Sequence, residues 1–189
     1  MSTRGAIVRF TNGEITEFAG RYHHWDSPPP HLGATLWGLY HGHFGKDLRR
    51  MLEVLIDEHP AGWSTINGGD FSLAPGFDEG LKREDRRPKC YCHGDRSEEE
   101  HLVTHESAAD IGCEYVYGFD EGPTLVVLSS YCEDGDKMIG MFGMGAPQAV
   151  WKEIGRVPLD GPEPDWDRIQ CGEYLERCGH VEGYHEERR

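Results

Sequence analysis

Residues 21–30, RYHHWDSPPP, place two histidines and an aspartate directly before three prolines. Successive prolines hold an extended left-handed conformation, so we expect them to delay the following helix and to fix the directions of the preceding side chains. Alternate side chains of an extended segment share a face, which would bring His24 and Asp26 together. A carboxylate beside an imidazole is the usual support of a general base or of a metal-ligating histidine. The segment therefore predicts a functional polar corner.

A structural interpretation of the same corner stays open. Asp26 would then cap the turn ahead of Pro28, and Trp25 would pack beneath the helix. Under the functional interpretation, the corner and two histidines that follow the first helix form one ligand-binding edge. Its predicted residues are His23, His24, Trp25, Asp26, His41 and His43.

Cysteines and histidines recur in two segments, CYCHG at 90–94 and CGEYLERCGHVEGYH at 171–185, and these residue types suit zinc. The Cys-x-Cys spacing is unusual, because zinc-finger cysteines stand two to four residues apart within a pair. On one helix, Cys171 and Cys178 would lie about 10 Å apart along the axis, too far for one ion. Zinc is the one candidate cofactor, and buried or solvent-facing thiols are the alternative. The predicted structural site consists of Cys90, Cys92, Cys178 and His180.

Ser2 supports an enzymatic alternative. Removal of Met1 would leave a free α-amine, with a pKa of about 8, beside the serine hydroxyl. This amine can act as the general base for its own residue, as in N-terminal-nucleophile hydrolases. The alternative is an amide or ester hydrolase with Ser2 as nucleophile and Arg21 and Asp26 as the residues that position the substrate.

Length and charge limit the class of protein. A chain of 189 residues is the size of one ordinary domain. Its net charge of −15 repels phosphate backbones and anionic lipids, so neither nucleic acid nor membrane is an expected partner. Without an apolar run of membrane-spanning length or an export signal, we expect a cytoplasmic protein with reduced cysteines.

The first segment, RGAIVRFTNGEITEFAG, predicts a β-hairpin over about residues 5–19, with a two-residue turn at Asn12-Gly13. Apolar side chains would then meet across the ladder. The expected pairs are Phe10 with Ile15 and Ile7 with Phe18.

Two amphipathic helices follow the prolines, because apolar residues recur at helical spacing. Asp47 can cap the second helix, which must stop near His59-Pro60 since the residue before a proline is pushed out of the helical region. The two stripes are Leu32, Leu36, Leu39 and Tyr40, and then Leu48, Met51, Leu52, Leu55 and Ile56.

Apart from a short strand at GWSTI, periodicity fails from residue 61 to about 110, and we assign 67–112 to a long loop. A β-meander follows at 113–119, 124–131 and 137–142. Residues 158–189 form a C-terminal extension packed on the rest. The sequence thus predicts a single α+β domain over residues 1–189.

The opening MSTRGAIVRF with its hairpin, the element YHHWDSPP with Gly33, and the later EYVYGF resemble a group of uncharacterised small proteins of phages and actinobacteria. Those proteins open with Met, a small residue and Thr-Arg-Gly, and reach a His-x-Asp-x-Pro-like element after a hairpin. The resemblance implies a phage-type accessory protein and carries no established activity. With the polar corner, it favours a non-catalytic protein that binds a host protein or a small polar ligand.

Overall fold

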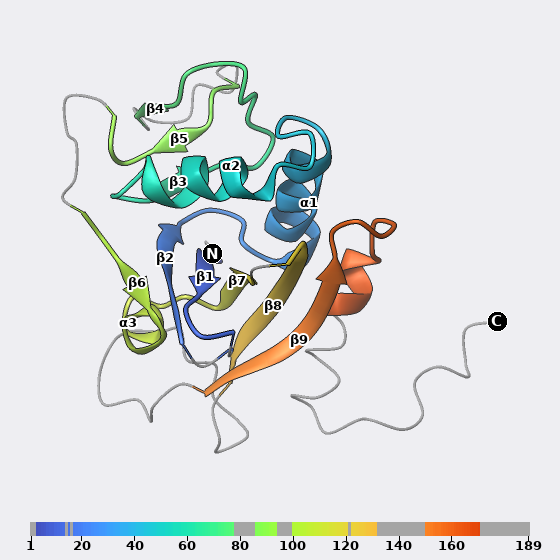
Figure 1. The fold of residues 1–189 in the computed structure, drawn as a ribbon. Coiled ribbons are helices and arrows are strands. Elements are labelled where there is room, and N and C mark those ends of the chain that lie inside the picture. Colours follow the sequence, from blue (N-terminus) through green and yellow to red (C-terminus); the bar gives the residue numbers. More distant parts are fainter. Residues whose placement is uncertain are drawn as a thin grey trace.

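Strand β1 lies in the middle of a mixed sheet in a computed structural model of the protein (Figure 1). The structure describes residues 3–13, 15, 17–77, 86–93, 100–120, 122–131 and 150–170. Nine strands lie within these ranges and run in the order β4-β5-β3-β2-β1-β7-β8-β9, with β6 beside β2. Their bounds are β1 (Gly5–Phe10), β2 (Phe18–His23), β3 (Trp63–Thr65), β4 (Gly76–Phe77), β5 (Lys89–Cys90), β6 (Val103–Thr104), β7 (Tyr115–Phe119), β8 (Thr124–Tyr131) and β9 (Val150–Pro158). The predicted α+β class is confirmed.

The central strands β1 and β7 are buried on both faces, which explains why they are almost continuously apolar. One face packs against the two helices that follow β2, in a core that includes Ile7, Leu36, Met51, Tyr117 and Val127. The other face packs against a short helix, α3 (His105–Asp110), in a core that includes Ala6, Val8, Phe18, Ala108 and Val126. The side chains of successive β1 residues therefore pack alternately in the two cores.

The hairpin of β1 and β2 is real, but its predicted register is wrong. Phe10 pairs with Phe18 and Ile7 pairs with Arg21, and Thr11 donates its N–H to the carbonyl of Glu17 at 3.0 Å. The connection is longer than a two-residue turn at Asn12-Gly13. Phe18 thus lies opposite Phe10 rather than Ile7, so the register differs from the predicted one by three residues. Because this number is odd, the β2 side chains point to the opposite face of the sheet from the one predicted. Phe18 thereby joins the α3 side of the sheet instead of meeting Ile7.

Both predicted helices are present as η1 (Pro29–Gly33) continuing into α1 (Ala34–His41), and α2 (Leu48–Leu52) continuing into η2 (Glu53–Asp57). The Asp47 carboxylate caps α2 by accepting the Arg50 N–H at 2.9 Å, as predicted. The prolines do not delay the first helix. Only Pro28 is extended, while Pro29 and Pro30 begin η1, because the first turn of a helix needs no N–H donors.

The segment expected to be a long loop contains β4, β5, β6 and α3. The short strand expected at GWSTI is confirmed as β3. Thr104 caps α3 through a reciprocal pair of hydrogen bonds with Ser107. These elements are too short to produce a periodic pattern, so sequence periodicity does not reveal them.

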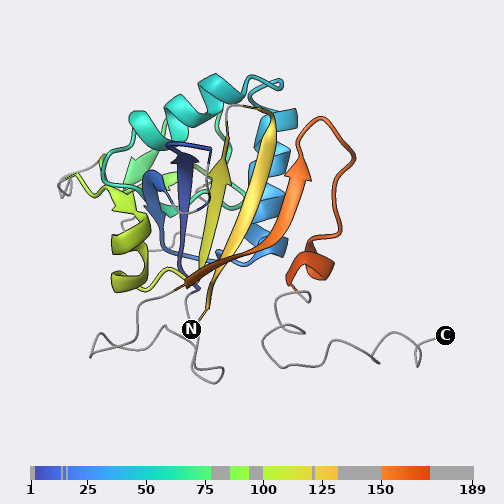
Figure 2. The same ribbon diagram turned by 60° about the horizontal axis from the view of Figure 1, so that its bottom comes forward.

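Strands β7 and β8 pair antiparallel, as predicted, and β9 is the other neighbour of β8. The predicted third strand at 137–142 lies outside the described residues. After β9 the chain turns back (Figure 2). This segment contacts α1, because the Tyr40 hydroxyl donates to Asp160 at 3.3 Å. Within the described ranges, no helix has the length and apolar character needed to cross a membrane.

Candidate metal centre

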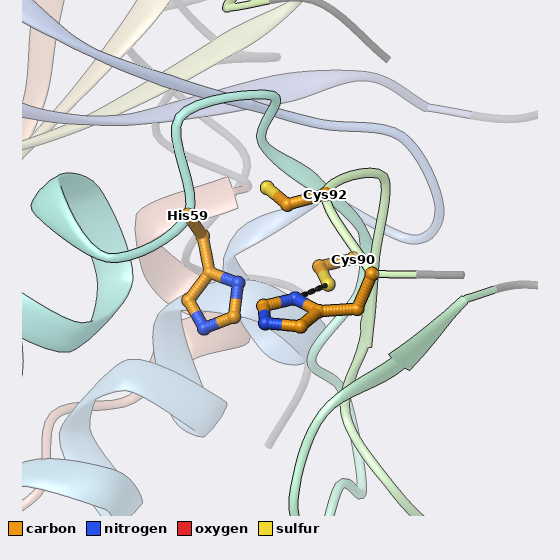
Figure 3. A group of neighbouring side chains, drawn as sticks. His59, Cys90 and Cys92 are labelled. Atoms are coloured by element: carbon orange, nitrogen blue, oxygen red, sulfur yellow. Dashed lines mark hydrogen bonds between the residues drawn. The ribbon is translucent and has the colours of Figure 1, made fainter. Parts of the chain in front are cut away.

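Four side chains of metal-binding type gather between the end of η2 and strand β5. One donor atom from each lies within 4.8 Å of every other. Figure 3 shows a ring nitrogen of His59 turned toward the sulfur atoms. The group, called the Cys/His cluster below, consists of His59, Cys90, Cys92 and His93.

His59 reaches this position because the chain turns as soon as η2 ends. Pro60 restricts the residue before it, and the Gly62 N–H donates to the His59 carbonyl at 2.9 Å to close the turn. Gly62 adopts a φ of 81°, a conformation that favours glycine. The His59 ring then packs on Trp63, with ring centroids 4.1 Å apart. The turn that ends the predicted helix therefore also positions His59 in the cluster.

The His59 side chain is 3% exposed, and its buried Nδ1 has no hydrogen-bond partner among the described residues. Burial, with a smaller effect of nearby His93, lowers the pKa of His59 to about 4, so the ring is neutral near pH 7. A neutral imidazole with a free nitrogen is the form that binds metal ions. Leaving a buried polar atom unpaired costs about 1–3 kcal/mol, and a metal–nitrogen bond would remove that cost.

Strand β5 and the bend after it supply the other three side chains. Cys90 is fully buried opposite Trp63 in the β3–β5 ladder, whereas Cys92 is partly buried and His93 is exposed. The Cys90 Sγ lies 3.0 Å from His93 Nδ1 (dashed line in Figure 3), and the Ala61 N–H donates to Cys92 Sγ at 3.2 Å. Burial raises the pKa of Cys90, so this thiol is protonated in the absence of a metal.

The cluster fits a tetrahedral ion with two sulfur and two nitrogen ligands. Bond lengths of about 2.3 Å to sulfur and 2.0–2.1 Å to nitrogen place the ligand atoms around zinc about 3.3–3.8 Å apart. With all donor atoms already within 4.8 Å, binding requires no pair to approach by more than about 1.5 Å. Small rotations of four side chains provide such a movement.

The Cys90–His93 contact also resembles the thiol–imidazole pair of a nucleophilic enzyme. Two observations argue against that role. Cys90 is fully buried, and its pKa is raised, whereas a reactive cysteine is partly exposed and has a lowered pKa. A bound metal would account for both the burial of Cys90 and the lack of a hydrogen-bond partner for His59 Nδ1 among the described residues.

The polar corner is built differently, beginning with His23. Both ring nitrogens of this fully buried side chain are paired: the Ile66 N–H donates to Nε2 at 3.3 Å, and Nδ1 lies 2.8 Å from Ser27 Oγ. Because Nε2 accepts a hydrogen bond, Nδ1 carries the proton and donates to Ser27. This direction is opposite to that of a base that activates a serine. Burial, with a smaller effect of His24, lowers the pKa of His23 to about 3.

The strand alternation from which a shared face for His24 and Asp26 was predicted stops before Asp26, because β2 ends at His23 and Asp26 has a φ of 56°. The Tyr22 hydroxyl lies 2.8 Å from His24 Nδ1. Trp25 is 40% exposed rather than packed beneath a helix, although its ring contacts that of His24. Asn67 holds the corner by donating from Nδ2 to the carbonyl oxygens of Trp25 and Asp26.

Other predicted site residues lie away from the exposed corner. Arg21 is 7% exposed and caps η2 by donating from Nε to the Ile56 carbonyl at 2.8 Å, while its Nη2 bonds Glu100 at 2.9 Å. His41 stacks on Trp37 with ring centroids 3.9 Å apart, and His43 contacts Phe44 and Phe71. The described contacts do not join either histidine to the corner.

Ser2, Cys178 and His180 lie outside the described residues, so the structure does not place these predicted site residues. The neighbouring Thr3 does lie at the corner, where its carbonyl accepts the Ser27 N–H at 3.1 Å. The structure brings Cys90 and Cys92 together with His93 and with His59. His59 was missed as a ligand because it is distant in sequence, and its only signal was the His-Pro pair at a helix end.

Comparisons of the chain with protein-family models, curated proteins and solved structures found no match. The assignment of a function therefore depends on the contacts of the described residues.

Proposed function

We propose that this protein binds one zinc ion through the Cys/His cluster and that the ion stabilises the fold. The observation that carries the proposal is the buried Nδ1 of His59, which has no hydrogen-bond partner in the described part of the chain and lies among two thiols and a second imidazole (Figure 3). A zinc ion in this place would satisfy that nitrogen and replace the protons of both thiols.

A structural role fits better than a catalytic one. Four protein side chains complete a tetrahedral shell, whereas catalytic zinc sites keep a position open for water or substrate. His59 and Cys90 are also buried, which keeps substrate from that side of the cluster.

The region around β5 needs such support because its sheet pairing is short. Strands β4 and β5 contain two residues each, and β5 is bonded to a three-residue strand, β3. A metal would fix the bend at residues 90–93 to the turn at His59. Structural zinc supplies folding free energy in small elements of this kind.

The donor set favours zinc over the hard cations. Thiolate sulfur and imidazole nitrogen suit Zn²⁺, while Mg²⁺ and Ca²⁺ prefer oxygen ligands. Co²⁺ accepts the same tetrahedral shell and provides a spectroscopic probe of the ligands.

The test is elemental analysis of the full chain, purified without a metal-binding tag. We expect about one zinc per chain in the wild type and almost none in His59→Ala or Cys90→Ser, because either change removes a buried ligand. The Co²⁺-loaded wild type should show sulfur-to-metal charge-transfer absorption that Cys90→Ser weakens.

His31→Ala is the matched control, since His31 is an exposed histidine outside the cluster. It should retain the zinc content of the wild type. Wild-type protein that binds neither zinc nor cobalt, or His59→Ala protein that keeps a full complement of zinc, would contradict the proposal.

A second candidate is the binding of a host protein or small polar ligand at the corner, as a phage-type accessory protein would do. Two observations favour it: Asp26 holds a left-handed backbone conformation at an exposed position, and Trp25 beside it is 40% exposed. Non-glycine residues in that conformation are concentrated at functional sites.

Capture from host lysate with wild type and the His24→Ala/Asp26→Ala double variant tests this candidate. We expect partners or metabolites that the wild type retains and the variant loses, while both keep the same zinc content. Identical retained sets would remove the corner as a binding site.

A further inference from the structure

The Cys/His cluster has a buried side and a side open to solvent. His59 and Cys90 are 3% and 0% exposed, whereas Cys92 is partly exposed and His93 is exposed. If all four bind a metal, Cys92 is therefore the more exposed of the two cysteine ligands.

The two thiols are also close enough to react with each other. Their sulfur atoms lie within 4.8 Å, only Tyr91 separates them in the chain, and the residues after Cys90 form a bend rather than an extended strand. An oxidised Cys92 would thus have a partner thiol beside it. Oxidation-sensitive cysteines are typically exposed thiolates with such a resolving cysteine nearby.

Cys113 provides an internal contrast. It is 1% exposed and belongs to the core on the α3 side of the sheet, away from Cys90. Burial raises the pKa of its thiol, and it contacts no metal-binding group in the described cluster. A soluble oxidant should leave Cys113 unchanged while the fold persists.

We propose that Cys92 is a site of oxidation by peroxides and that its oxidation releases the metal. The inference rests on the proposed zinc site. The Cys92 thiolate attacks one oxygen of the peroxide; a sulfur–oxygen bond forms, the oxygen–oxygen bond breaks, and hydroxide leaves. Cys92 is oxidised by two electrons to a sulfenic acid, and the peroxide is reduced.

The Cys90 thiolate then attacks the Cys92 sulfur. A disulfide forms, the sulfur–oxygen bond breaks, and the departing hydroxide takes up a proton to become water. Two thiolates, one hydrogen peroxide and two protons thus yield one disulfide and two waters. The cluster keeps only the His59 and His93 imidazoles as ligands, too few to retain zinc in a four-ligand site.

The experiment treats the zinc-loaded full chain with hydrogen peroxide and follows zinc release with a chromophoric chelator. Dimedone traps the sulfenic acid, and peptide mass analysis locates it. Trypsin cleavage after Lys89 and Arg96 isolates both cysteines in the single peptide 90–96.

We expect release of about one zinc per chain, in step with the loss of two hydrogen masses from peptide 90–96. With dimedone present, the adduct should be on Cys92. Thiol reduction followed by zinc addition should restore the site. Cys92→His keeps a fourth ligand without the thiol, so its zinc release should be slower by on the order of tenfold or more.

Cys113→Ala is the control and should release zinc at the wild-type rate. Dimedone on Cys90 with Cys92 unmodified, or zinc release while peptide 90–96 stays reduced, would overturn the inference. If Cys92→His does not load zinc, the position of the wild-type dimedone adduct decides the question.

The two proposals fail in different ways. Untreated protein without zinc contradicts the proposed function, while zinc-loaded protein that keeps its metal in peroxide contradicts only the oxidation of Cys92.

Discussion

His23 and His59 are two buried histidines with different surroundings. They are 0% and 3% exposed, and burial lowers the pKa of His23 to about 3 and that of His59 to about 4. His23 has partners at both ring nitrogens, in Ser27 and the Ile66 backbone, whereas Nδ1 of His59 has none within the described ranges. The pKa shift alone does not separate a structural histidine from a candidate ligand, but the hydrogen-bond partners do.

Because of this difference, we expect substitutions at the two histidines to affect different properties of the protein. Loss of His23 breaks an internal network and leaves buried donors unpaired, so its main effect should be on stability. Loss of His59 removes a nitrogen that bonds no protein group, so its main effect should be on metal content. Three changes test this distinction, beginning with the largest expected effect.

Removal of the metal should produce the largest change. We expect a chelator to lower the melting temperature of the wild type, because a ligand at about 100 times its Kd stabilises the folded state by about 2.7 kcal/mol. The His59→Ala variant should melt at the same temperature with and without chelator. Differential scanning calorimetry measures both. A chelator effect that persists in His59→Ala would show that the metal binds elsewhere.

His23→Gln should cost about 2–3 kcal/mol of unfolding free energy, because glutamine cannot satisfy both hydrogen bonds of the imidazole. Its zinc content should match that of the wild type. Urea titrations and elemental analysis check the two expectations. A His23→Gln variant that lost its zinc but kept its stability would contradict the assignment of a structural role to His23.

The same variant tests a pH dependence. The folded pKa of His23, about 3, is below its ordinary value of 6.5, so the unfolded chain binds the proton first as the pH falls. The contribution to stability is therefore complete above pH 6.5 and decreases toward pH 3, by about 1.4 kcal/mol per pH unit for one proton. In chelator, His23→Gln should lose less stability on acidification than wild type or His31→Gln. Equal slopes would contradict the burial of a neutral His23.

Sequence alone located the helices because their signals are local. Asp47 is a capping residue, and His59-Pro60 ends a helix by steric restriction. The hairpin register was predicted wrongly because Asn12-Gly13 is also a local signal, but the two-sided burial of β1 decides the pairing. That burial depends on helices from distant parts of the chain.

The candidate site was only partly visible for a related reason. Cys90 and Cys92 stand out by residue type and proximity, whereas His59 joins them only through the packing of η2 and the β3–β5 pairing. At the corner, the prediction assumed that strand alternation continues to Asp26. The left-handed backbone there breaks the alternation, and residue spacing alone does not reveal it.

Asp26→Gly should produce the smallest effect and separates strain at the corner from function. Asp26 and Lys46 are the two non-glycine residues with positive φ in the described parts of the chain, at 56° and 71°. Glycine removes the steric cost of that conformation but adds entropy to the unfolded chain. We therefore expect the free energy of unfolding of each glycine variant to rise by at most about 1 kcal/mol. Lys46→Gly is the matched control, because Lys46 lies in the turn between α1 and α2 and belongs to neither candidate site. Chemical denaturation measures the gains, and lysate capture measures binding. If the corner binds a ligand, Asp26→Gly should lose that ligand while Lys46→Gly keeps it. Loss of stability in Asp26→Gly alone would mean that the Asp26 side chain supports the fold, and the backbone conformation would then give no support to a binding role.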